Sequence, residues 1–585
     1  MFKIFKYMDW KEWLMLFLTL AIVCVQVWCN VSIPKCTLEI SNYLLMPDIG
    51  AYWKEIVLAC MKMLGFAVGV LISAVTASYF ASMVVTSLLA KVRGKTFEKV
   101  NAFSSEEVNK FSIPSLITRS TNDVSSLQQI LTIMLTMGIG APLMAVFAIV
   151  NIVSLSKNYS VSNLSWINVI SVIAIALIVF VIVFAVVPKF KTIQSYTDKL
   201  SSVTREGLTG IKVIRACGAE EQQEAKFENV NKKYSKLDLF VNKVTSIIDP
   251  GLSLVMSLTS LAIVWAVGLL SGHDPALLAI MSTFTQYSLY IITAFTSLSM
   301  IFVLLPRGIV SGKRINEVLD NKISLTDGKG IVEIEQDQRG KIKFENVSFR
   351  YPGADAEVLE NISFEANAGQ TIAFIGSTGS GKSTLINLIP RFYDCTSGQI
   401  FINGKNIKDY KLEQLHDLIG YVPQKGVLFS GTVKENIKYG KLDATDDEVK
   451  EAIDISGSKF VYDFPEGIEH HISQGGKNVS GGQKQRLSIA RAIIRNPDFL
   501  IFDDSFSALD YKTDKTVRRK INKKFSSTTK LIVAQRIGTI MNADKIIVLD
   551  EGKIVGMGKH KELLKNCEVY KQIALSQLTE EELSK

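Results

Sequence analysis

Six long apolar runs that contain no acidic or basic residue dominate the first half of this 585-residue chain. They cover residues 13–33, 63–90, 127–155, 165–187, 250–270 and 277–305. About 20 consecutive apolar residues are enough for an α-helix to cross the hydrocarbon core of a membrane, so each run predicts a spanning helix. A signal peptide would carry one short apolar region with a cleavage site. Here a long first run is followed by five more, so we expect the N-terminus to stay attached.

The connections between these runs alternate in charge. The connection between the second and third runs carries Lys91, Arg93, Lys95, Lys99, Lys110 and Arg119, and the connection between the fourth and fifth runs is richer still in lysine. The connections near 156–164 and 271–276 are short and nearly uncharged. Because positively charged connections stay on the cytoplasmic side, both chain ends are predicted to be cytoplasmic. The two basic connections have helical spacing, so we expect the spanning helices to extend into the cytoplasm.

The composition fits an integral membrane protein better than a nucleic-acid-binding protein. The formal charge is +9 and 48% of the residues are hydrophobic, with a mean hydropathy of +0.23. Lysine and arginine accumulate in cytoplasmic connections, which accounts for the charge without a nucleic-acid partner. The seven cysteines lack paired spacing, so neither a zinc site nor a disulfide framework is expected. Spans without charge also argue against an ion or proton pathway built on carboxylates.

A glycine-rich loop between a strand-like and a helix-like segment marks the second half. Thr371–Ile375 predicts a strand and Leu385–Ile389 a helix. Between them lie Gly376, Ser377, Thr378, Gly379, Ser380, Gly381, Lys382, Ser383 and Thr384, a complete phosphate-binding loop in its required context. The glycines let backbone N–H groups face the phosphates, Lys382 reaches the outer phosphates, and Ser383 is expected to ligate Mg²⁺. The loop therefore predicts ATP and Mg²⁺ as cofactors.

Two further segments carry residues that suit a nucleotide site. The apolar run Phe499–Phe502 predicts a strand that ends at Asp503 and Asp504, the place where nucleotide enzymes hold magnesium. Asp503 is the expected Mg²⁺ partner; without the upstream loop, the pair would read as a helix cap. A second anion-binding turn at a helix start is formed by Ser480, Gly481, Gly482 and Gln483.

The order of these segments resembles that of an ATP-binding cassette. The resemblance rests on the phosphate loop, the glutamine loop Tyr421-Val422-Pro423-Gln424, the signature sequence Val479–Gln483, the strand ending at Asp503, and the turn Ser507-Ala508-Leu509-Asp510. By resemblance, Tyr351 stacks on adenine, and Gln424 belongs to both the catalytic and the magnesium-binding sets.

Six spans followed by one cassette resemble an exporter half-transporter along essentially the whole chain. This likeness implies a multi-domain fold: an all-α six-helix transmembrane domain at 1–310, a linker at 311–339, and an α/β P-loop nucleotide-binding domain at 340–585. It also implies a second half-transporter as partner, because each ATP site combines one chain's phosphate loop with the other's signature sequence. Ser115–Asp123 and Thr204–Ile211 look like the helices that contact the cassettes. A small amphipathic or lipophilic substrate, with lipid as the alternative, is implied at the bacterial cell membrane.

Besides Val479, which stands in place of the usual leucine of the signature sequence, two residues depart from the family pattern. Asp504 stands where hydrolytic cassettes have a glutamate, and Gln535 stands where they have a histidine. With Gln424, these residues form the predicted catalytic set. The paired change favours a heterodimer in which this chain binds ATP, hydrolyses it poorly and donates Ser480–Gln483 to a competent site. The alternatives are a homodimer with two slow sites and a nucleotide-gated regulatory or channel-like protein.

Overall fold

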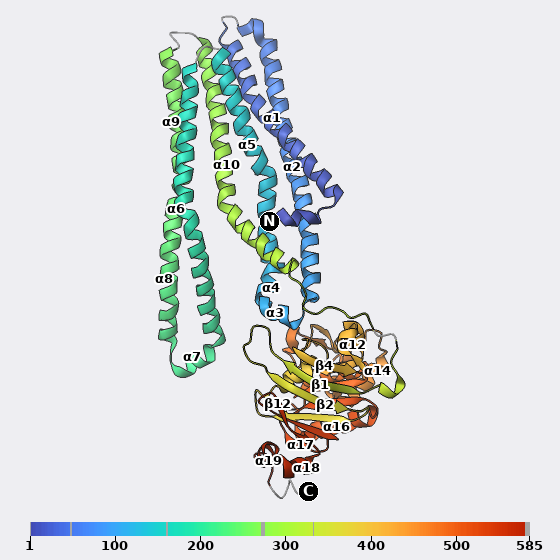
Figure 1. Ribbon diagram of the computed structural model, residues 1–585. Helices are drawn as coiled ribbons and strands as arrows, with labels where there is room; N and C mark the ends of the chain where they lie inside the picture. The colour runs from blue at the N-terminus through green and yellow to red at the C-terminus, as the bar shows by residue number, and fades with distance from the viewer. Residues whose placement is uncertain (1, 47–48, 159–161, 271–274, 331–332, 580–585) are drawn as a thin grey trace. The chain divides into compact units, whose positions relative to one another are not determined.

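The computed structural model describes residues 2–46, 49–158, 162–270, 275–330 and 333–579. Internal contacts divide the chain into two compact units (Figure 1). The first, called the membrane unit, comprises Met1–Ala102 and Ser112–Asn321, and the second, called the cassette unit, comprises Phe103–Phe111 and Lys322–Lys585. The helix that precedes the cassette runs to Leu319. The predicted domain boundaries at 310 and 340 stay a prediction.

Long helices make up the membrane unit. They are α1 (Trp10–Leu44), α2 (Trp53–Asn101), α5 (Asn122–Asn158), α6 (Ser162–Thr209), α8 (Glu220–Thr245), α9 (Ile248–Leu270) and α10 (Pro275–Leu319). The short element η1 (Phe2–Tyr7) precedes α1, and η2 (Ile49–Tyr52), α4 (Ile113–Ser120) and α7 (Ile211–Cys217) lie between the long helices. Only helices and closed barrels satisfy every backbone polar group in lipid, which explains this architecture.

Five of the predicted spans lie on helical segments that are long and apolar enough to cross a membrane, among the residues that the structure describes. These segments are Trp10–Leu44, Ile49–Asn101, Ile113–Lys157, Glu220–Leu269 and Ala279–Leu319. The remaining run, 165–187, lies on α6, where the described apolar stretch is Trp166–Ile178. Large apolar side chains such as Leu71, Phe184 and Trp265 point outward and are well exposed. Such faces suit contact with lipid tails.

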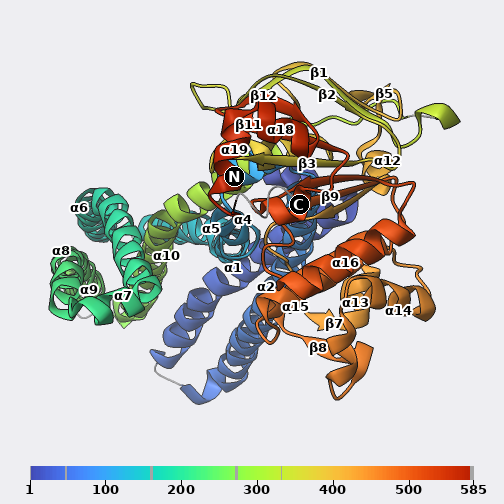
Figure 2. The ribbon, with the colours of Figure 1, turned by 90° about the horizontal axis from the view of Figure 1, so that it is seen from below.

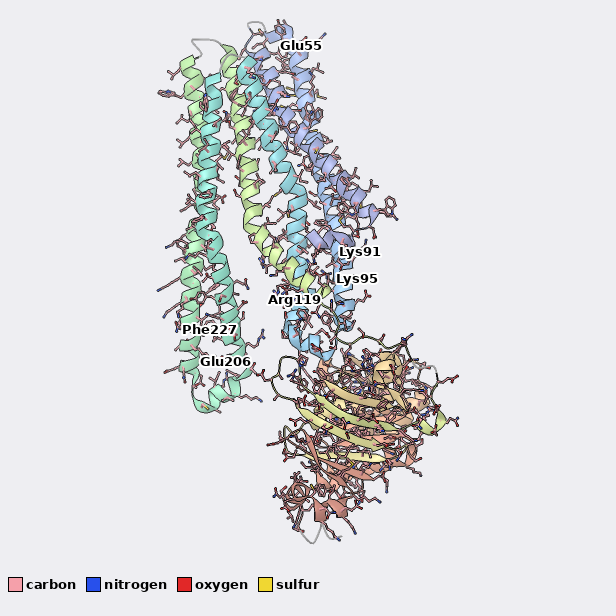
Figure 3. The ribbon with its side chains drawn as sticks, viewed as in Figure 1. Glu55, Lys91, Lys95, Arg119, Glu206 and Phe227 are labelled. Carbon is pink, nitrogen blue, oxygen red and sulfur yellow. The ribbon has the colours of Figure 1, made fainter. Side chains whose placement is uncertain are left out.

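Polar pairs hold the spans together. Ser171 on α6 and Thr259 on α9 share a hydrogen bond of 2.6 Å, and the Tyr287 hydroxyl on α10 donates to the Val31 carbonyl oxygen on α1 at 3.0 Å. Interhelical hydrogen bonds of this kind stabilise helix packing in lipid. Along α2, the basic residues Lys91 and Lys95 lie far from Glu55, which is in the first turn of the helix (Figure 3).

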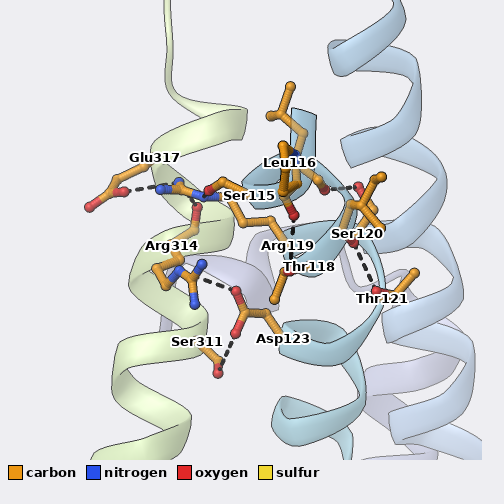
Figure 4. Close-up of polar contacts among 12 residues, drawn as sticks. Ser115, Leu116, Thr118, Arg119, Ser120, Thr121, Asp123, Ser311, Arg314 and Glu317 are labelled. Atoms are coloured by element: carbon orange, nitrogen blue, oxygen red, sulfur yellow. Dashed lines mark hydrogen bonds and ion pairs between the residues drawn. The ribbon is translucent and has the colours of Figure 1, made fainter. Parts of the chain in front are cut away.

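A polar cluster joins the base of α5 to the end of α10 (Figure 4). Asp123 accepts a hydrogen bond from Ser311 at 3.0 Å and pairs with Arg314 at 3.4 Å. Arg119 donates to the Arg314 carbonyl oxygen and to Glu317, at 2.7 and 2.9 Å. These contacts bind Ser115–Asp123 into the membrane unit.

The segment that groups with the cassette unit is instead α3 (Ser105–Phe111), so the predicted contact helix in the first basic connection was placed too far along the chain. Ser112 explains the break between the two segments, because its φ of 65° ends α3, and the next helix begins at Ile113 with Pro114 in its first turn. In the second connection, Thr204–Ile211 covers the end of α6 and the first residue of α7.

Glu107 fastens α3 to the start of the linker within the cassette unit. Its side chain is 3% exposed and accepts hydrogen bonds from Ser104 N and Ser104 Oγ at 2.7 and 2.5 Å, and from Ser324 N at 2.7 Å. Burial alone would raise the pKa of this carboxyl, but the hydrogen bonds from Ser104 and Ser324 outweigh burial and hold the pKa below its ordinary value. The carboxylate therefore favours the folded state while it is ionised.

We expect Glu107→Gln to lower the stability of the cassette unit by about 1–3 kcal/mol, because an NH₂ group would face backbone donors. Thermal unfolding of the purified protein at pH 7 measures this loss, and Glu106→Gln is the control for charge. Since the folded-state pKa is lowered, the contribution is present above the ordinary carboxyl pKa of about 4.3 and is lost as the pH falls through the folded-state value. An unfolding midpoint equal to that of the control at pH 7 would contradict this role.

Two sheets form the frame of the cassette unit. The main sheet has the order β12-β11-β3-β10-β9-β6, with β3, β6, β9, β10 and β11 parallel. Its strands are β3 (Thr371–Gly376), β6 (Ile419–Val422), β9 (Phe499–Asp503), β10 (Thr529–Val533), β11 (Lys545–Asp550) and β12 (Lys553–Gly558). The second sheet, in the order β2-β1-β4-β5, is antiparallel and contains β1 (Ile342–Phe349), β2 (Leu359–Ala366), β4 (Ser397–Ile402) and β5 (Lys405–Asn406).

Helices cover the main sheet and form a separate helical part. In Figure 2, α13 (Val433–Lys438), α14 (Asp446–Ile455), α15 (Gly481–Ile493) and α16 (Tyr511–Lys524) gather on one side with β7 (Gly431–Thr432) and β8 (His471–Ile472), opposite β1 and β2. The remaining α-helices are α11 (Lys382–Leu388), α12 (Leu412–Asp417), α17 (Ile537–Ile540), α18 (His560–Asn566) and α19 (Glu568–Leu575).

Every residue of β9 is buried, as expected of a central parallel strand. The carboxyl ends of β3, β9 and β10 therefore meet at one edge, where ligands of such sheets bind.

Candidate nucleotide site

The phosphate loop joins the end of β3 to the start of α11, as the sequence predicts. Gly379 and Gly381 have φ values of 87° and 92°, which favour glycine, and a Cβ at Gly381 would lie 2.7 Å from a Leu359 methyl carbon. Lys382 Nζ donates to the carbonyl oxygens of Gly376 and Ser377, at 3.0 and 2.6 Å, and contacts Ser380 Oγ at 3.2 Å. Burial lowers the pKa of this ammonium group. A nearby phosphate would favour its charged form.

Two of the three residues predicted to hold magnesium touch each other. Ser383 Oγ donates to Asp503 Oδ1 at 2.8 Å, and Asp503 is 5% exposed at the end of β9. Burial raises the pKa of Asp503, so a cation beside it would offset the cost of a buried carboxylate. Hydroxyl, carboxylate and amide oxygens form the donor set that Mg²⁺ prefers. The residues present therefore fit this ion, and Ser383, Asp503 and Gln424 would hold it.

The three predicted catalytic residues come together at the carboxyl edge of the sheet. Gln535 Nε2 lies 3.0 Å from Asp504 Oδ2, and Gln424 Nε2 lies 3.5 Å from the same oxygen. Asp504 is 7% exposed and has a φ of 45°, a left-handed conformation that aspartate tolerates better than most residues. Burial raises its pKa, although hydrogen bonds from Gln424 and Ser507 oppose the shift. One carboxylate oxygen is therefore shared by two side-chain amides.

Tyr351 lies beside the phosphate loop. Its hydroxyl is 3.0 Å from Thr384 Oγ1, and its ring packs edge-on against Phe349 and Tyr393, with centroids 4.9 and 5.3 Å away. The side chain is half-buried, so one part of the ring stays accessible. This position agrees with the predicted contact to adenine, which stays a prediction.

The signature sequence begins α15 at a separate place in the same unit. Ser480 Oγ accepts from Gln483 N at 3.3 Å, and Gln483 Oε1 accepts from Ser480 N at 2.8 Å, which forms a capping box. Ser480 and Gly481 are exposed. In the described part of the chain, no hydrogen bond joins Ser480–Gln483 to the phosphate loop.

Gln485 is a residue of this region that sequence reasoning missed. It is 1% exposed, and its amide donates to the Pro423 carbonyl oxygen at 2.9 Å and accepts from Gly426 N at 3.0 Å. These bonds tie the glutamine loop to the signature helix. The signal in the sequence was a long polar residue within a helix that buries mostly apolar side chains.

Comparisons with known proteins agree with this geometry. The family described as "ABC transporter" matches residues 359–507, and the family described as "ABC transporter transmembrane region" matches residues 14–295. An uncharacterised ABC transporter ATP-binding protein of Mycobacterium tuberculosis is 36% identical over 519 residues, which are 88% of each chain. The ATP-dependent lipid A-core flippase of Pseudomonas aeruginosa is 32% identical over 83% of this chain and 79% of its own length.

A solved structure shares the fold along the whole length. It is a bacterial Atm1-family ABC exporter with ATP bound, with a TM-score of 0.79, 22% identity, and coverage of 96% of this chain and 98% of that one. Spanning helices followed by one ATP-binding unit make a half-transporter of the plasma membrane, which works with a second ABC subunit. The chain therefore belongs to the ABC transporter family, as an integral membrane ATPase with the fold of an exporter, which binds ATP and couples its hydrolysis to transport.

Proposed function

We propose that this chain is the degenerate-site subunit of a heterodimeric exporter, which binds Mg²⁺ and ATP on its own phosphate loop but hydrolyses the ATP poorly. The observation that carries the proposal is the pairing of Asp504 with Gln535, at 3.0 Å. Both residues stand where hydrolytic members of the family have a glutamate and a histidine. They depart from the pattern together, at the two positions nearest the transferred phosphoryl group.

The chemistry of these side chains explains the impairment. The Asp504 carboxylate is one methylene shorter than that of glutamate, and a displacement of about 1 Å at a catalytic group can cost on the order of a hundredfold in rate. Gln535 donates a hydrogen bond but cannot exchange a proton near neutral pH. In addition, its amide and that of Gln424 both face the carboxylate oxygen that would otherwise accept from water. Asp504 is thus short and already engaged.

The signature sequence, which this chain would donate to the partner's ATP site, is intact at Ser480–Gln483. Ser480, Gly481, Gly482 and Gln483 keep the family pattern, form a well-capped helix start and are accessible at Ser480. This part of the chain would complete an ATP site on a different subunit whose own phosphate loop is competent. A homodimer with two slow sites is the second candidate, because the hydrogen bond from Gln535 keeps Asp504 in place and an aspartate can still orient water.

The cargo proposed is a small amphipathic or lipophilic compound moved outward, with lipid as the alternative. The spans contain no charged residue that would recognise an ion. Among the relatives, one Bacillus subtilis protein is named a putative multidrug export protein, and the Pseudomonas aeruginosa relative is a lipid A-core flippase. The uncharged spans also give no support to a channel-like protein that binds ATP without pumping.

The test compares ATPase activity of the chain purified alone in lipid with that of the chain co-expressed with a similar half-transporter encoded next to it. We expect activity to appear only in the co-expressed complex, because this chain lacks the glutamate and histidine of a competent site. The same amount of this chain is used in both samples. Robust activity from the chain alone would establish a working homodimer and overturn the proposal.

A further inference from the structure

We propose that Gln577 is a positioning residue for ATP, which clamps the loop carrying Gln535 from the C-terminal end of the cassette unit. The inference rests on the proposed role of Gln535 at the γ-phosphate. Gln577 Nε2 donates to the Gln535 carbonyl oxygen at 2.7 Å, and Gln577 Oε1 accepts from Ile537 N at 2.9 Å. One side-chain amide thus pairs with the backbone on both sides of Arg536.

The helix before Gln577 is firmly anchored. Tyr570 and Ala574 on α19 are fully buried, and the Tyr570 hydroxyl lies 2.7 Å from His560 Nδ1 on α18. The backbone N–H of Gln577 donates to the Ala574 carbonyl oxygen at 3.1 Å, which continues the helical turn beyond Leu575. The Gln577 side chain is exposed, but the backbone that carries it is held by the packed helices α18 and α19.

The clamped loop needs such a partner. β10 ends at Val533, so Gln535 lies beyond the sheet, and its carbonyl oxygen has no strand to pair with. The Gln577 amide supplies that donor and also caps the first N–H group of α17. The side chain of Gln535 then reaches Asp504 at 3.0 Å. A chain of contacts thus runs from α19 through the Gln535 backbone to the residue nearest the transferred phosphoryl group.

This arrangement makes a selective prediction. A clamp that orients the Gln535 amide favours a nucleotide with a γ-phosphate, so its loss weakens ATP binding and leaves ADP binding unchanged. A purely structural role would weaken both nucleotides in parallel. Gln577→Met removes both hydrogen bonds and keeps the length of the side chain. Gln577→Glu keeps the acceptor for Ile537 N but loses the donor to Gln535.

The measurement is photolabelling of this chain by 8-azido-ATP and 8-azido-ADP in the lipid-embedded transporter, because labelling reports the loop of this polypeptide whichever subunit is its partner. We expect both Gln577 variants to need about threefold to tenfold more ATP for half-maximal labelling, at unchanged ADP labelling. Gln572→Met, at an exposed position of α19, is the matched control and should behave as wild type.

The Gln535→Ala variant separates the proposed role of Gln535 at the γ-phosphate from the proposed clamp by Gln577. If it leaves the ratio of ATP to ADP affinity unchanged, Gln535 has no role at the γ-phosphate, and the basis of the inference is lost. If it lowers that ratio and both Gln577 variants do not, the clamp is wrong while the role of Gln535 stands. If both change the ratio and the Gln535→Ala/Gln577→Met double variant is no worse than Gln535→Ala, the two residues act as one unit, as proposed.

Discussion

Replacing Asp504 with Glu and Gln535 with His together should restore hydrolysis at this chain's own site by about a hundredfold. The longer side chain moves the carboxylate toward the water, and the imidazole can exchange a proton that an amide cannot. The Gln535→His change also removes the amide that now lies 3.0 Å from Asp504 Oδ2. The measurement is ATPase activity of the assembled complex in lipid, with the partner's own hydrolysis silenced by mutation.

Silencing the partner matters because a competent second site would hide the gain. Asp504→Glu and Gln535→His as single variants are the controls, and each should recover only part of the activity, since base and phosphate contact act as a unit. The double variant with an unsilenced partner should gain no more than about twofold, because two sites then contribute. No change in the silenced complex would remove the claim that these two positions limit the site.

Ser480→Ala should lower the ATPase activity of the complex about tenfold or more, whereas Lys382→Ala should lower it about twofold or less. Ser480 is proposed to act on the ATP held by the competent partner, where loss of an anion-binding donor affects turnover directly. Lys382 acts on this chain's own loop, where little hydrolysis occurs. Steady-state ATPase measurements on both variants give the ranking.

The structure supplies a matched control for Ser480. Thr445 caps the N-terminus of α14 with the same capping box, in which its hydroxyl accepts from Glu448 N at 3.3 Å. Thr445→Ala should therefore cost about the same stability, roughly 1 kcal/mol, without lowering ATPase activity. Equal losses from Ser480→Ala and Lys382→Ala would support a homodimer. A larger loss from Lys382→Ala would count against donation of the signature sequence.

Local features explain why much of the site was predictable. The phosphate loop, the strand that ends at Asp503 and the helix start at Ser480 are contiguous segments, and each carries its chemistry in neighbouring residues. The resemblance to the family then brought Tyr351 and Gln424 into the set. The structure places the predicted catalytic residues Asp504, Gln535 and Gln424 at one sheet edge, because parallel strands end on the same side.

The position of the segment that groups with the cassette unit was not predictable in the same way. Ser115–Asp123 and Ser105–Phe111 are both short, polar and helical, so local pattern does not distinguish them. The choice depends on which side chains find partners. Glu107 meets Ser324, 217 residues away in sequence, whereas Arg119 and Asp123 meet the end of α10.

What the sequence by itself determined is the spanning helices and the phosphate chemistry, because apolar length and contiguous motifs act within one segment. What only the tertiary structure decided are the pairings between distant segments: Glu107 with the linker, Gln485 with the glutamine loop, and Gln577 with the loop of Gln535. Each is a polar side chain that satisfies a backbone group left open where a strand, loop or helix ends. Such groups must find a partner, but the sequence does not say which distant residue folding brings within about 3 Å.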